Sequence, residues 1–472
     1  MADAQASEHD AIVIGAGPAG EVCAGALAGE GLDVALVERE LVGGECAYWA
    51  CMPSKALLRP AQLLAEAARV PGAAEAMTSS VHAAAVLARR DEVIHGLDDD
   101  AQLPWVHDRG ITLHRGRARL DGPRRVRIDG DAGVDGGRVL TARRAVVIAT
   151  GSGAAIPPIP GLREVAPWTN RQATTSKRVP ERLTVLGGGA VGCELAQAWS
   201  SLGARTTLVE ALPRLLATEE PFASELLGGA MAELGVDVRL DAKATAVARA
   251  ADGTITLTLQ SGAEIVGDEL LVAVGRRPHT DELGLETVGL EPGKPVAVDD
   301  RMRALAGGEG GGSDWLYAVG DANGRSLLTH AGKYQARVAV ATIAGRDAVA
   351  AWDGPLSPRV VFCEPQIGAV GRTLERARAD GLRARAVDAD PGATAGASFV
   401  GRGAPSGARI VVDEEREVIV GATFAGPEIA DMLQAATIAL VTEVPLRRLA
   451  HAIPCFPTRS EVWLSLLEPW AP

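Results

Sequence analysis

The sequence predicts an α/β protein that contains one strand–turn–helix–strand unit twice. The first copy is the apolar strand and turn in AIVIGAGPAGEVCAG, followed by the strand LDVALVE, which ends on Glu38. The second copy is LTVLGGGAVGCELAQ, followed by ARTTLVE, which ends on Glu210. Each copy has a Gly-x-Gly-x-x-Gly turn, and the interval from turn to glutamate is the same in both. Two such copies indicate two Rossmann-like domains.

The size and composition are those of a cytoplasmic protein with several domains. At 472 residues the chain is long enough for about three domains of roughly 150 residues each. A net charge of -13 argues against nucleic acid as a partner, because phosphate binding needs a basic surface. The acidic start MADAQASEHD lacks the positive region of a secretory signal, and the first apolar run is too short for a membrane span. Six cysteines are few, as expected in a reducing cytoplasm.

The glycine turns point to dinucleotide binding. The first glycine permits the tight bend, the second lets the backbone approach a pyrophosphate, and the third allows the helix to pack closely on the strand. The helix N-terminus then offers N–H groups and positive charge to the phosphates, while the acidic residue accepts hydrogen bonds from ribose hydroxyls. These glycines are Gly15, Gly17 and Gly20 in the first copy, and Gly187, Gly189 and Gly192 in the second. Two sites in one chain predict a flavin paired with a nicotinamide.

Further segments give the chain a family resemblance. GAGPAG, GGECAYWACMPSK, VVIATGS, GGGAVGCELAQ, VGRRP, LYAVGDANG and FPTRSE follow one another between about residue 10 and residue 465. In these segments and their order the chain resembles the pyridine nucleotide–disulfide oxidoreductases, which include dihydrolipoyl dehydrogenase, glutathione reductase and mercuric reductase. The resemblance implies FAD in the first Rossmann-like unit and the nicotinamide in the second. It also implies electron transfer from NAD(P)H through FAD to a redox-active disulfide.

The resemblance also assigns residues around the flavin. Asp321, in AVGDANG, matches the aspartate that binds the ribityl chain. Thr329 is expected to be the N-cap of the following helix, whose N-terminus would stabilise negative charge near the flavin N1–C2 carbonyl. Other positions that match cofactor-binding residues are Thr150, Gly151, Ala331 and Gly275.

Glu210, the last residue of the second copy, bears on the choice between NADH and NADPH. The Glu210 carboxylate would repel a 2′-phosphate, whereas NADP sites place an arginine nearby. Arg214 lies four residues further on and would partly offset this preference. We predict that NADH is favoured.

Cys46 and Cys51 admit three interpretations. A structural zinc site needs about four ligands in paired short spacings, and the sequence has no second such pair, so no metal is predicted. A structural disulfide is disfavoured in a reducing cytoplasm. The third interpretation is a redox pair, and the helical pattern SKALLRPAQLLAEAAR after Cys51 would lower the pKa of a thiol at its positive end.

The resemblance gives the two cysteines separate roles. It implies that Cys51 is the charge-transfer thiolate facing the flavin and that Cys46 is the interchange thiol that meets the substrate. Lys55 matches the lysine beside flavin N5, and Glu194 matches its ionic partner.

The chain departs from the family pattern in two places. Tyr48 and Trp49 lie between the cysteines, where the family has small or aliphatic residues and an asparagine. They either fill core volume or shape the substrate side of the dithiol. At the C-terminal motif HPTxSE, Phe456 occupies the place of the acid–base histidine, while the orienting glutamate is retained as Glu461. Phenylalanine cannot exchange a proton, so the usual route is not available.

Three consequences of Phe456 remain open. In the first, the acceptor needs little proton transfer from the enzyme, as with a metal thiolate, a quinone or a disulfide with a low-pKa leaving thiol. Mercury is not expected, because the chain ends LLEPWAP without extra cysteines and has no N-terminal metal-binding module. A second option follows 2-ketopropyl coenzyme M oxidoreductase/carboxylase, which also has phenylalanine here. That enzyme lacks the lysine and has histidine for the glutamate, whereas Lys55 and Glu461 are both present. In the third, His451 or Cys455 supplies the proton.

The main prediction is therefore a FAD-dependent enzyme acting on a small disulfide, thiol or quinone-like acceptor. The rivals are reductive thioether cleavage with carboxylation, a diaphorase or quinone reductase with direct flavin-to-acceptor transfer, and a redox-sensing flavoprotein without turnover.

The resemblance implies two Rossmann-like dinucleotide-binding domains plus a C-terminal α+β dimerisation domain. Residues 1–152 and 281–350 would form the FAD and central regions, and 153–280 the NAD(P) domain, entered through AAIPPIPGL. Residues 351–472 would form the dimerisation domain, with FPTRSE reaching the partner subunit's disulfide in a homodimer. GGEGGG, residues 307–312, is expected to be a flexible loop.

Overall fold

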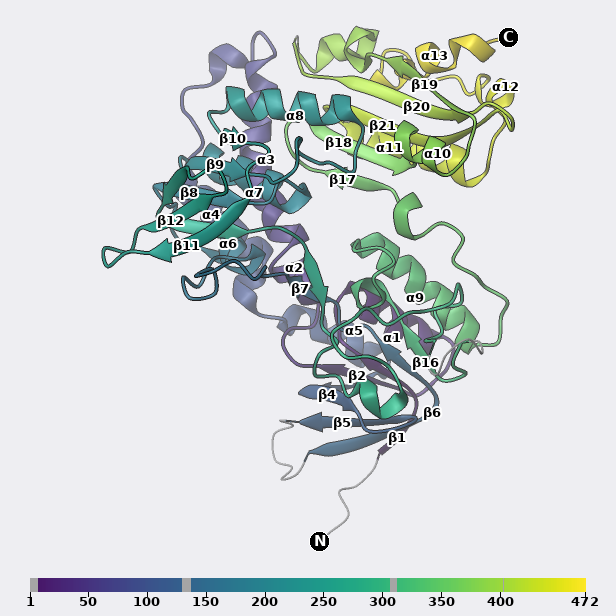
Figure 1. Cartoon of the computed structure of the whole chain (residues 1–472). Coiled ribbons are helices and arrows are strands. Elements are labelled where there is room, and N and C mark those ends of the chain that lie inside the picture. Colours follow the sequence, from purple (N-terminus) through teal and green to yellow (C-terminus); the bar gives the residue numbers. More distant parts are fainter. Residues whose placement is uncertain (1–6, 130–136, 306–311, 402) are drawn as a thin grey trace. The chain divides into compact units, whose positions relative to one another are not determined.

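The computed structural model describes residues 7–129, 137–305, 312–401 and 403–472 (Figure 1). The chain forms two compact units. The first contains Met1–Pro53, Asp91–Ala154 and Arg276–Pro355, and the second contains Ser54–Arg90, Ala155–Gly275 and Leu356–Pro472. Most of the expected loop GGEGGG lies outside the described residues. Within the described ranges, no helix is both long enough and apolar enough to cross a membrane.

The first unit is built on one mainly parallel sheet. Its strands run in the order β3-β2-β1-β6-β5-β4, and β16 pairs with the end of β6. Pairing is parallel from β3 through β2 and β1 to β6, and also between β6 and β16. On the other side of β6, β5 pairs with it in antiparallel fashion, and β4 pairs with β5 in the same way. The strand bounds are β1 Ser7–Ile14, β2 Val34–Glu38, β3 Thr112–Arg115, β4 Arg117–Leu120, β5 Arg125–Asp129, β6 Arg138–Ile148 and β16 Leu316–Ala318.

The two faces of this sheet have separate cores. Alternate residues of β1 point to opposite faces, so that Val13 packs with helices α1 and α9 while Ile12 packs with β4, β5 and the segment around Leu285. The helices are α1 Pro18–Gly29, α2 Gly44–Tyr48, α5 Leu103–Asp108 and α9 Thr329–Ile343. A small antiparallel pair, β7 Ser152–Ala154 with β15 Arg276–Pro278, belongs to the same unit.

The second unit repeats the Rossmann-like arrangement. Its parallel sheet has the order β10-β9-β8-β14, with bounds β8 Arg182–Leu186, β9 Arg205–Val209, β10 Asp237–Arg239 and β14 Glu269–Val272. The helices are α3 Cys51–Ala68, α4 Ala83–Val93, α6 Asn170–Thr175, α7 Ala190–Ser201 and α8 Pro221–Glu233. Of these, α3 begins in the first unit and α4 ends in the first unit. One core joins this sheet to its helices around the fully buried Trp199. A second core joins it to the antiparallel sheet of β11 Ala244–Arg249, β12 Ile255–Leu259 and β13 Glu264–Gly267.

The C-terminal part of the second unit is an antiparallel sheet with helices. The order is β17-β18-β21-β20-β19, with bounds β17 Arg359–Val361, β18 Gln366–Gly371, β19 Ala384–Ala389, β20 Gly407–Asp413 and β21 Val418–Gly426. Its helices are α10 Leu374–Ala379, α11 Ile429–Val441, α12 Leu446–Leu449 and α13 Val462–Leu467. Helix α11 packs on β18 and β21, and α13 on β19 and β20. The predicted α/β class with a C-terminal α+β region is confirmed.

The two glycine turns have the same geometry. Gly15 and Gly187 both have positive φ, of 101° and 114°, which an L side chain rarely adopts. A Cβ atom on Gly20 would lie 1.8 Å from the Gly15 carbonyl oxygen, and one on Gly192 would lie 1.8 Å from that of Gly187. The third glycine of each turn is therefore fixed by close packing of helix on strand.

We expect Gly20→Ala and Gly192→Ala each to lower the free energy of unfolding by roughly 1–3 kcal/mol, because the new methyl group collides with backbone. Gly229, exposed inside α8 with nothing near its Cβ position, is the matched control. Gly229→Ala should stabilise by about 0.5–1 kcal/mol, since alanine is the better helix former. Urea unfolding followed by circular dichroism checks this. Equal effects at the three sites would contradict the packing argument.

Candidate active site

The two cysteines of the first unit both contact one hydroxyl group. Cys46 is in the short helix α2, and Cys51 is the first residue of α3. Both are thiols in this structure. The Thr329 hydroxyl donates to Cys46 Sγ at 3.2 Å and lies 3.5 Å from Cys51 Sγ. The predicted N-cap role of Thr329 is wrong: Leu328 is the N-cap, and Thr329 is the first helical residue, with its hydroxyl directed to the sulfurs.

The environment of the dithiol favours a proton on Cys46. Its hydrogen bond to Cys51, followed by burial, raises the pKa of Cys46 well above the ordinary range, although Thr329 and Lys333 act in the opposite direction. Cys51 begins an 18-residue helix, whose positive end favours a thiolate. In the reduced pair, Cys51 is therefore the better thiolate and Cys46 the proton carrier.

The aromatic residues between the cysteines have different environments. Tyr48 is 1% exposed, and its hydroxyl donates to the Val42 carbonyl at 3.0 Å. Tyr48 therefore fills core volume, which is the first of the two predicted alternatives. Trp49 packs on it, with 5.7 Å between ring centroids, and is partly exposed.

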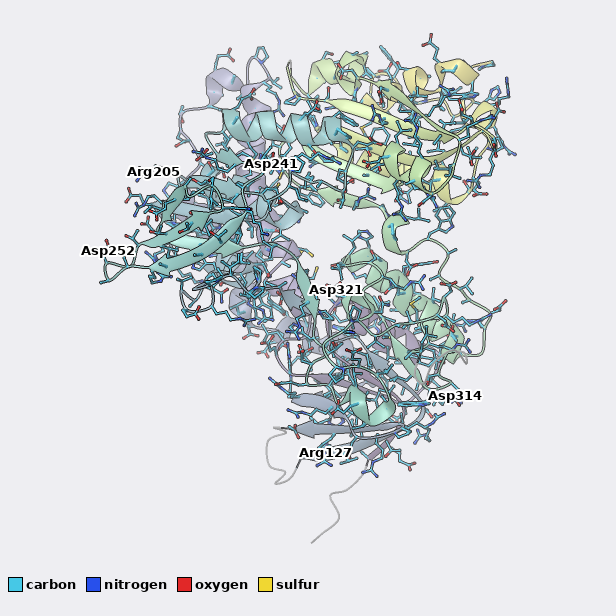
Figure 2. The ribbon with its side chains drawn as sticks, in the orientation of Figure 1. Arg127, Arg205, Asp241, Asp252, Asp314 and Asp321 are labelled. Carbon is cyan, nitrogen blue, oxygen red and sulfur yellow. The ribbon has the colours of Figure 1, made fainter. Side chains whose placement is uncertain are left out.

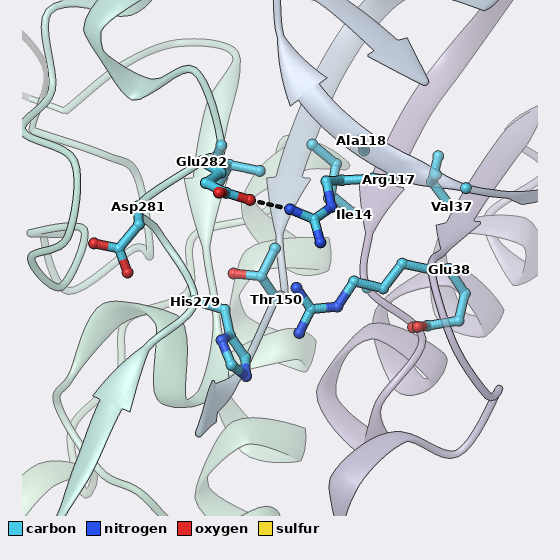
Figure 3. Close-up of a pocket in the computed structure, with 13 residues that line it drawn as sticks. Ile14, Val37, Glu38, Arg117, Ala118, Thr150, His279, Asp281 and Glu282 are labelled. Carbon is cyan, nitrogen blue, oxygen red and sulfur yellow. Dashed lines mark hydrogen bonds and ion pairs between the residues drawn. The ribbon is translucent and has the colours of Figure 1, made fainter. Parts of the chain in front are cut away.

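A cavity of about 380 Å³ in the first unit adjoins the first glycine turn (Figure 3). It is lined by Gly15, by Glu38 at the end of β2, and by Thr150. Burial raises the pKa of Glu38, but one carboxylate oxygen accepts the Ala16 N–H at 2.7 Å and the other accepts the Glu40 N–H at 2.7 Å. The buried Thr150 hydroxyl has no partner among the described residues. An unsatisfied hydroxyl beside a glycine turn and a carboxylate fits the adenosine end of a dinucleotide.

Asp321 lies in the same unit and is labelled in Figure 2. It accepts a hydrogen bond from the Ser152 hydroxyl at 2.5 Å, and Arg276 Nε lies 3.6 Å from the same carboxylate. Burial raises the pKa of Asp321. The neighbouring cofactor-site predictions also lie in this unit: Gly151 has a φ of 70°, and Ala331 is buried in the first turn of α9.

The second glycine turn has the same carboxylate contacts as the first. Glu210 accepts the Gly188 N–H at 2.5 Å and the Leu212 N–H at 2.8 Å. A Cβ atom on Gly189 or Gly275 would meet nothing within 4 Å, so both leave open space at this turn. These residues fit a second dinucleotide.

Arg214 does not face this carboxylate as a spare cation. Its guanidinium donates to the Glu219 carbonyl at 2.6 Å and to the Ala217 carbonyl at 2.7 Å. Because these bonds hold its own loop, Arg214 offsets the effect of Glu210 less than its position in the sequence suggested.

Lys55 and Glu194 form an ion pair within the second unit. Lys55 Nζ lies 2.6 Å from Glu194 Oε2, and the Glu194 side chain is 7% exposed. The other oxygen of Glu194 accepts the Phe362 N–H at 2.9 Å, and the Phe362 ring centroid lies 4.7 Å from Lys55 Nζ. Phe362 thus fixes both members of the pair. Phe362 was not among the residues predicted from the sequence, although its segment VVFCEP comes directly before β18.

The C-terminal motif presents an apolar residue to solvent. Phe456 is 77% exposed and Ile453 89% exposed, and His451 and Cys455 beside them are exposed as well. Glu461 Oε2 is buried without a hydrogen-bond partner among the described residues.

Two dinucleotide turns, a dithiol and a lysine–glutamate pair with a buried carboxylate define a flavin- and nicotinamide-dependent dithiol oxidoreductase. A family model for pyridine nucleotide-disulphide oxidoreductases matches residues 9–346, and the model for the dimerisation domain of that family matches residues 357–466. The chain belongs to this family, and it is a FAD-dependent oxidoreductase that also uses NAD(P).

Curated relatives have two different activities. The chain is 32% identical to a dihydrolipoyl dehydrogenase of Haloferax volcanii, over 98% of this chain and 96% of the relative. It is also 32% identical to a mercuric reductase of Shigella flexneri, over 93% of this chain and 77% of the relative. Among solved structures, LpdA from Mycobacterium tuberculosis matches with a TM-score of 0.85 and 25% identity, over 98% of this chain and 100% of that one. The Cu(II) complex of RclA from Escherichia coli matches with a TM-score of 0.83 and 23% identity, over 98% and 99%, which supports the fold alone.

We expect NADH to exceed NADPH in kcat/KM by roughly tenfold or more, because a 2′-phosphate would lie beside the Glu210 carboxylate. Glu210→Gln removes the charge and keeps one carbonyl acceptor, so it should reduce this ratio. Glu225→Gln, at an exposed position on α8, should leave the ratio unchanged. Steady-state kinetics with both nucleotides decide, and a wild-type efficiency with NADPH equal to that with NADH would reject the prediction.

Proposed function

We propose that this protein passes electrons from NADH through FAD to the Cys46–Cys51 pair and on to an acceptor that needs no acid–base histidine. The proposal is supported by Phe456, which is exposed at the position aligned with the family histidine, and by Glu461, whose Oε2 atom is buried without a hydrogen-bond partner among the described residues. The dithiol, its bridging hydroxyl and both glycine turns are retained, which supports electron transfer as far as the cysteines.

The proposed chemistry divides the work between the two sulfurs. The glycine turns would hold FAD and the nicotinamide, and a bound flavin would supply the transfer of an electron pair from the nicotinamide to the disulfide. Cys51 holds the negative charge of the reduced pair at the start of α3. Cys46, which is partly exposed, gives its proton to solvent and then attacks the acceptor as a thiolate. Lys55 and Glu194, fixed by Phe362, form the pair assigned to flavin N5 by the resemblance.

The acceptor is limited by how well its leaving group tolerates negative charge. Without an imidazole at position 456, a leaving alkyl thiolate is not protonated by the enzyme, and its departure is slow. A disulfide with a low-pKa leaving thiol, a quinone or a metal thiolate has no such requirement. The similarity to a mercuric reductase is consistent with this class of acceptor, but the chain is equally similar to a dihydrolipoyl dehydrogenase.

The exposed C-terminal segment supports a homodimer in which the active site is shared. Phe456 and Ile453 together present an apolar surface, which favours burial against another chain. We propose that this segment reaches the partner subunit's disulfide, and that residues 351–472 form the dimerisation domain. The corresponding proposals for the other regions are 1–152 and 281–350 for FAD and 153–280 for NAD(P).

Phe456→His tests the proposal by restoring a proton carrier next to Glu461. We expect reduction of lipoamide, whose leaving thiol is alkyl, to rise by roughly 10²-fold, as is typical of general acid–base catalysis. Reduction of 5,5′-dithiobis(2-nitrobenzoate), whose leaving thiol has a low pKa, should change far less. Phe399→His, at another exposed phenylalanine of the second unit, is the control.

Two outcomes would contradict the proposal. If wild type already reduces lipoamide as fast as the aromatic disulfide, the histidine is not missed, and another group moves the proton. If Cys46→Ser retains full turnover with either disulfide or with a quinone, the flavin reduces the acceptor directly, and the protein is a diaphorase.

A further inference from the structure

A second cavity, of about 250 Å³, lies in the C-terminal part of the second unit. Arg459 forms part of its wall, together with small residues that include Thr394, Ser398 and Ala404. Neither glycine turn nor the dithiol contributes to it. Its Arg459 comes three residues after Phe456, in the motif FPTRSE.

Arg459 is a buried cation with unsatisfied donors. The residue is 4% exposed, and its Nε and Nη2 atoms have no hydrogen-bond partner among the described residues. A Cβ atom on Gly426 would lie 2.7 Å from Arg459 Nη2, so glycine at this position makes room for the guanidinium. Buried N–H groups of a charged side chain are costly unless an acceptor is supplied.

A second arginine beside Arg459 also has unsatisfied donors. Burial lowers the pKa of Arg459 most strongly, and the nearby Arg69 lowers it further. Arg69 Nη1 lies 2.9 Å from Glu364 Oε1, yet Arg69 Nε and Nη2 have no hydrogen-bond partner among the described residues. Gly401, in the cavity wall, packs directly on Arg69. Glu364 is within electrostatic range of Arg459 as well, but it does not satisfy Arg459 Nε or Nη2.

Two further carboxylates lie near Arg459, so the guanidinium lacks hydrogen-bond acceptors rather than nearby negative charge. Asp390 and Glu428 both raise the pKa of Arg459, so both lie within electrostatic range. However, Asp390 accepts the Ser406 hydroxyl at 2.5 Å and the Gly392 N–H at 2.7 Å, and Glu428 is exposed. Neither forms an ion pair with Arg459 among the described residues.

We propose that this cavity binds a small oxyanion, such as inorganic phosphate or a carboxylate, through the Arg459 guanidinium. The planar fork of arginine donates two parallel N–H bonds to such an anion, and Nε with Nη2 form one edge of the fork. A volume of about 250 Å³ holds a phosphate ion together with several waters. The bound anion connects the turn that follows Phe456 to the segment around Thr394 and Ser398.

Phosphate binding to the FAD-loaded protein tests this directly. Isothermal titration with inorganic phosphate, at constant ionic strength in chloride, should show one site per chain. Thermal unfolding should shift upward by ~2 °C or more at saturation, since a ligand of the folded state stabilises it. Titration with acetate in parallel separates a carboxylate site from a phosphate site.

Three variants make the result specific. Arg459→Met should weaken phosphate binding at least roughly tenfold, because the fork is lost. Ala404→Leu fills the cavity and leaves Arg459 in place, so it should abolish the phosphate response even if Arg459→Met folds poorly. Arg447→Met, at an exposed arginine of α12, should keep the response. No saturable response to either anion in wild type, or an unchanged response in Ala404→Leu, would overturn the proposal.

Discussion

The chemistry of this protein depends on where the proton of the reduced Cys46–Cys51 pair resides. The hydrogen bond between the sulfurs and the burial of Cys46 keep the proton there, and the start of α3 favours negative charge on Cys51. The Thr329 hydroxyl contacts both sulfurs and can follow the charge, but a hydroxyl does not accept the proton at neutral pH. In the proposed function, Phe456 stands where a group that exchanges protons with the dithiol is expected, and phenylalanine cannot do so. The proposed limit on the acceptor therefore lies in proton transfer and not in electron transfer to the cysteines.

The two nucleotide sites are held by a repeated set of contacts. In each copy the glutamate at the end of the second strand accepts two backbone N–H groups. One comes from the residue between the first two glycines, and the other comes from the residue two positions after the glutamate. Glu38 and Glu210 therefore shape their turns. This shared role explains why the interval from turn to glutamate is the same in both copies. The predicted preference for NADH depends on the Glu210 carboxylate that these contacts hold in place.

The sequence predicted the parts of the site that depend on short-range patterns. The glycine turns, Glu38, Glu210 and the cysteine pair are each defined within a few residues of the chain, and the pairing of Lys55 with Glu194 followed from the family resemblance. It did not predict Phe362, because a backbone N–H and a ring that fix an ion pair depend on folding between distant segments. The bonds of Arg214 to nearby carbonyls, and the buried, unpaired state of Arg459, were equally invisible. Thr329 was expected to cap a helix, and its hydroxyl instead contacts two sulfurs that precede it by more than 270 residues.

An anaerobic titration of the FAD-loaded protein with NADH, followed by absorbance, tests whether Cys46 and Cys51 lie in the electron path. Wild type should take up two electrons and develop a long-wavelength thiolate-to-flavin band, because Cys51 holds the charge of the reduced pair. Cys51→Ser should lack this band, while Cys455→Ser, which removes an exposed thiol of the C-terminal segment, should retain it. If the flavin bleaches alike in wild type and Cys51→Ser, the cysteines are not in the electron path, and the account given for this site is wrong.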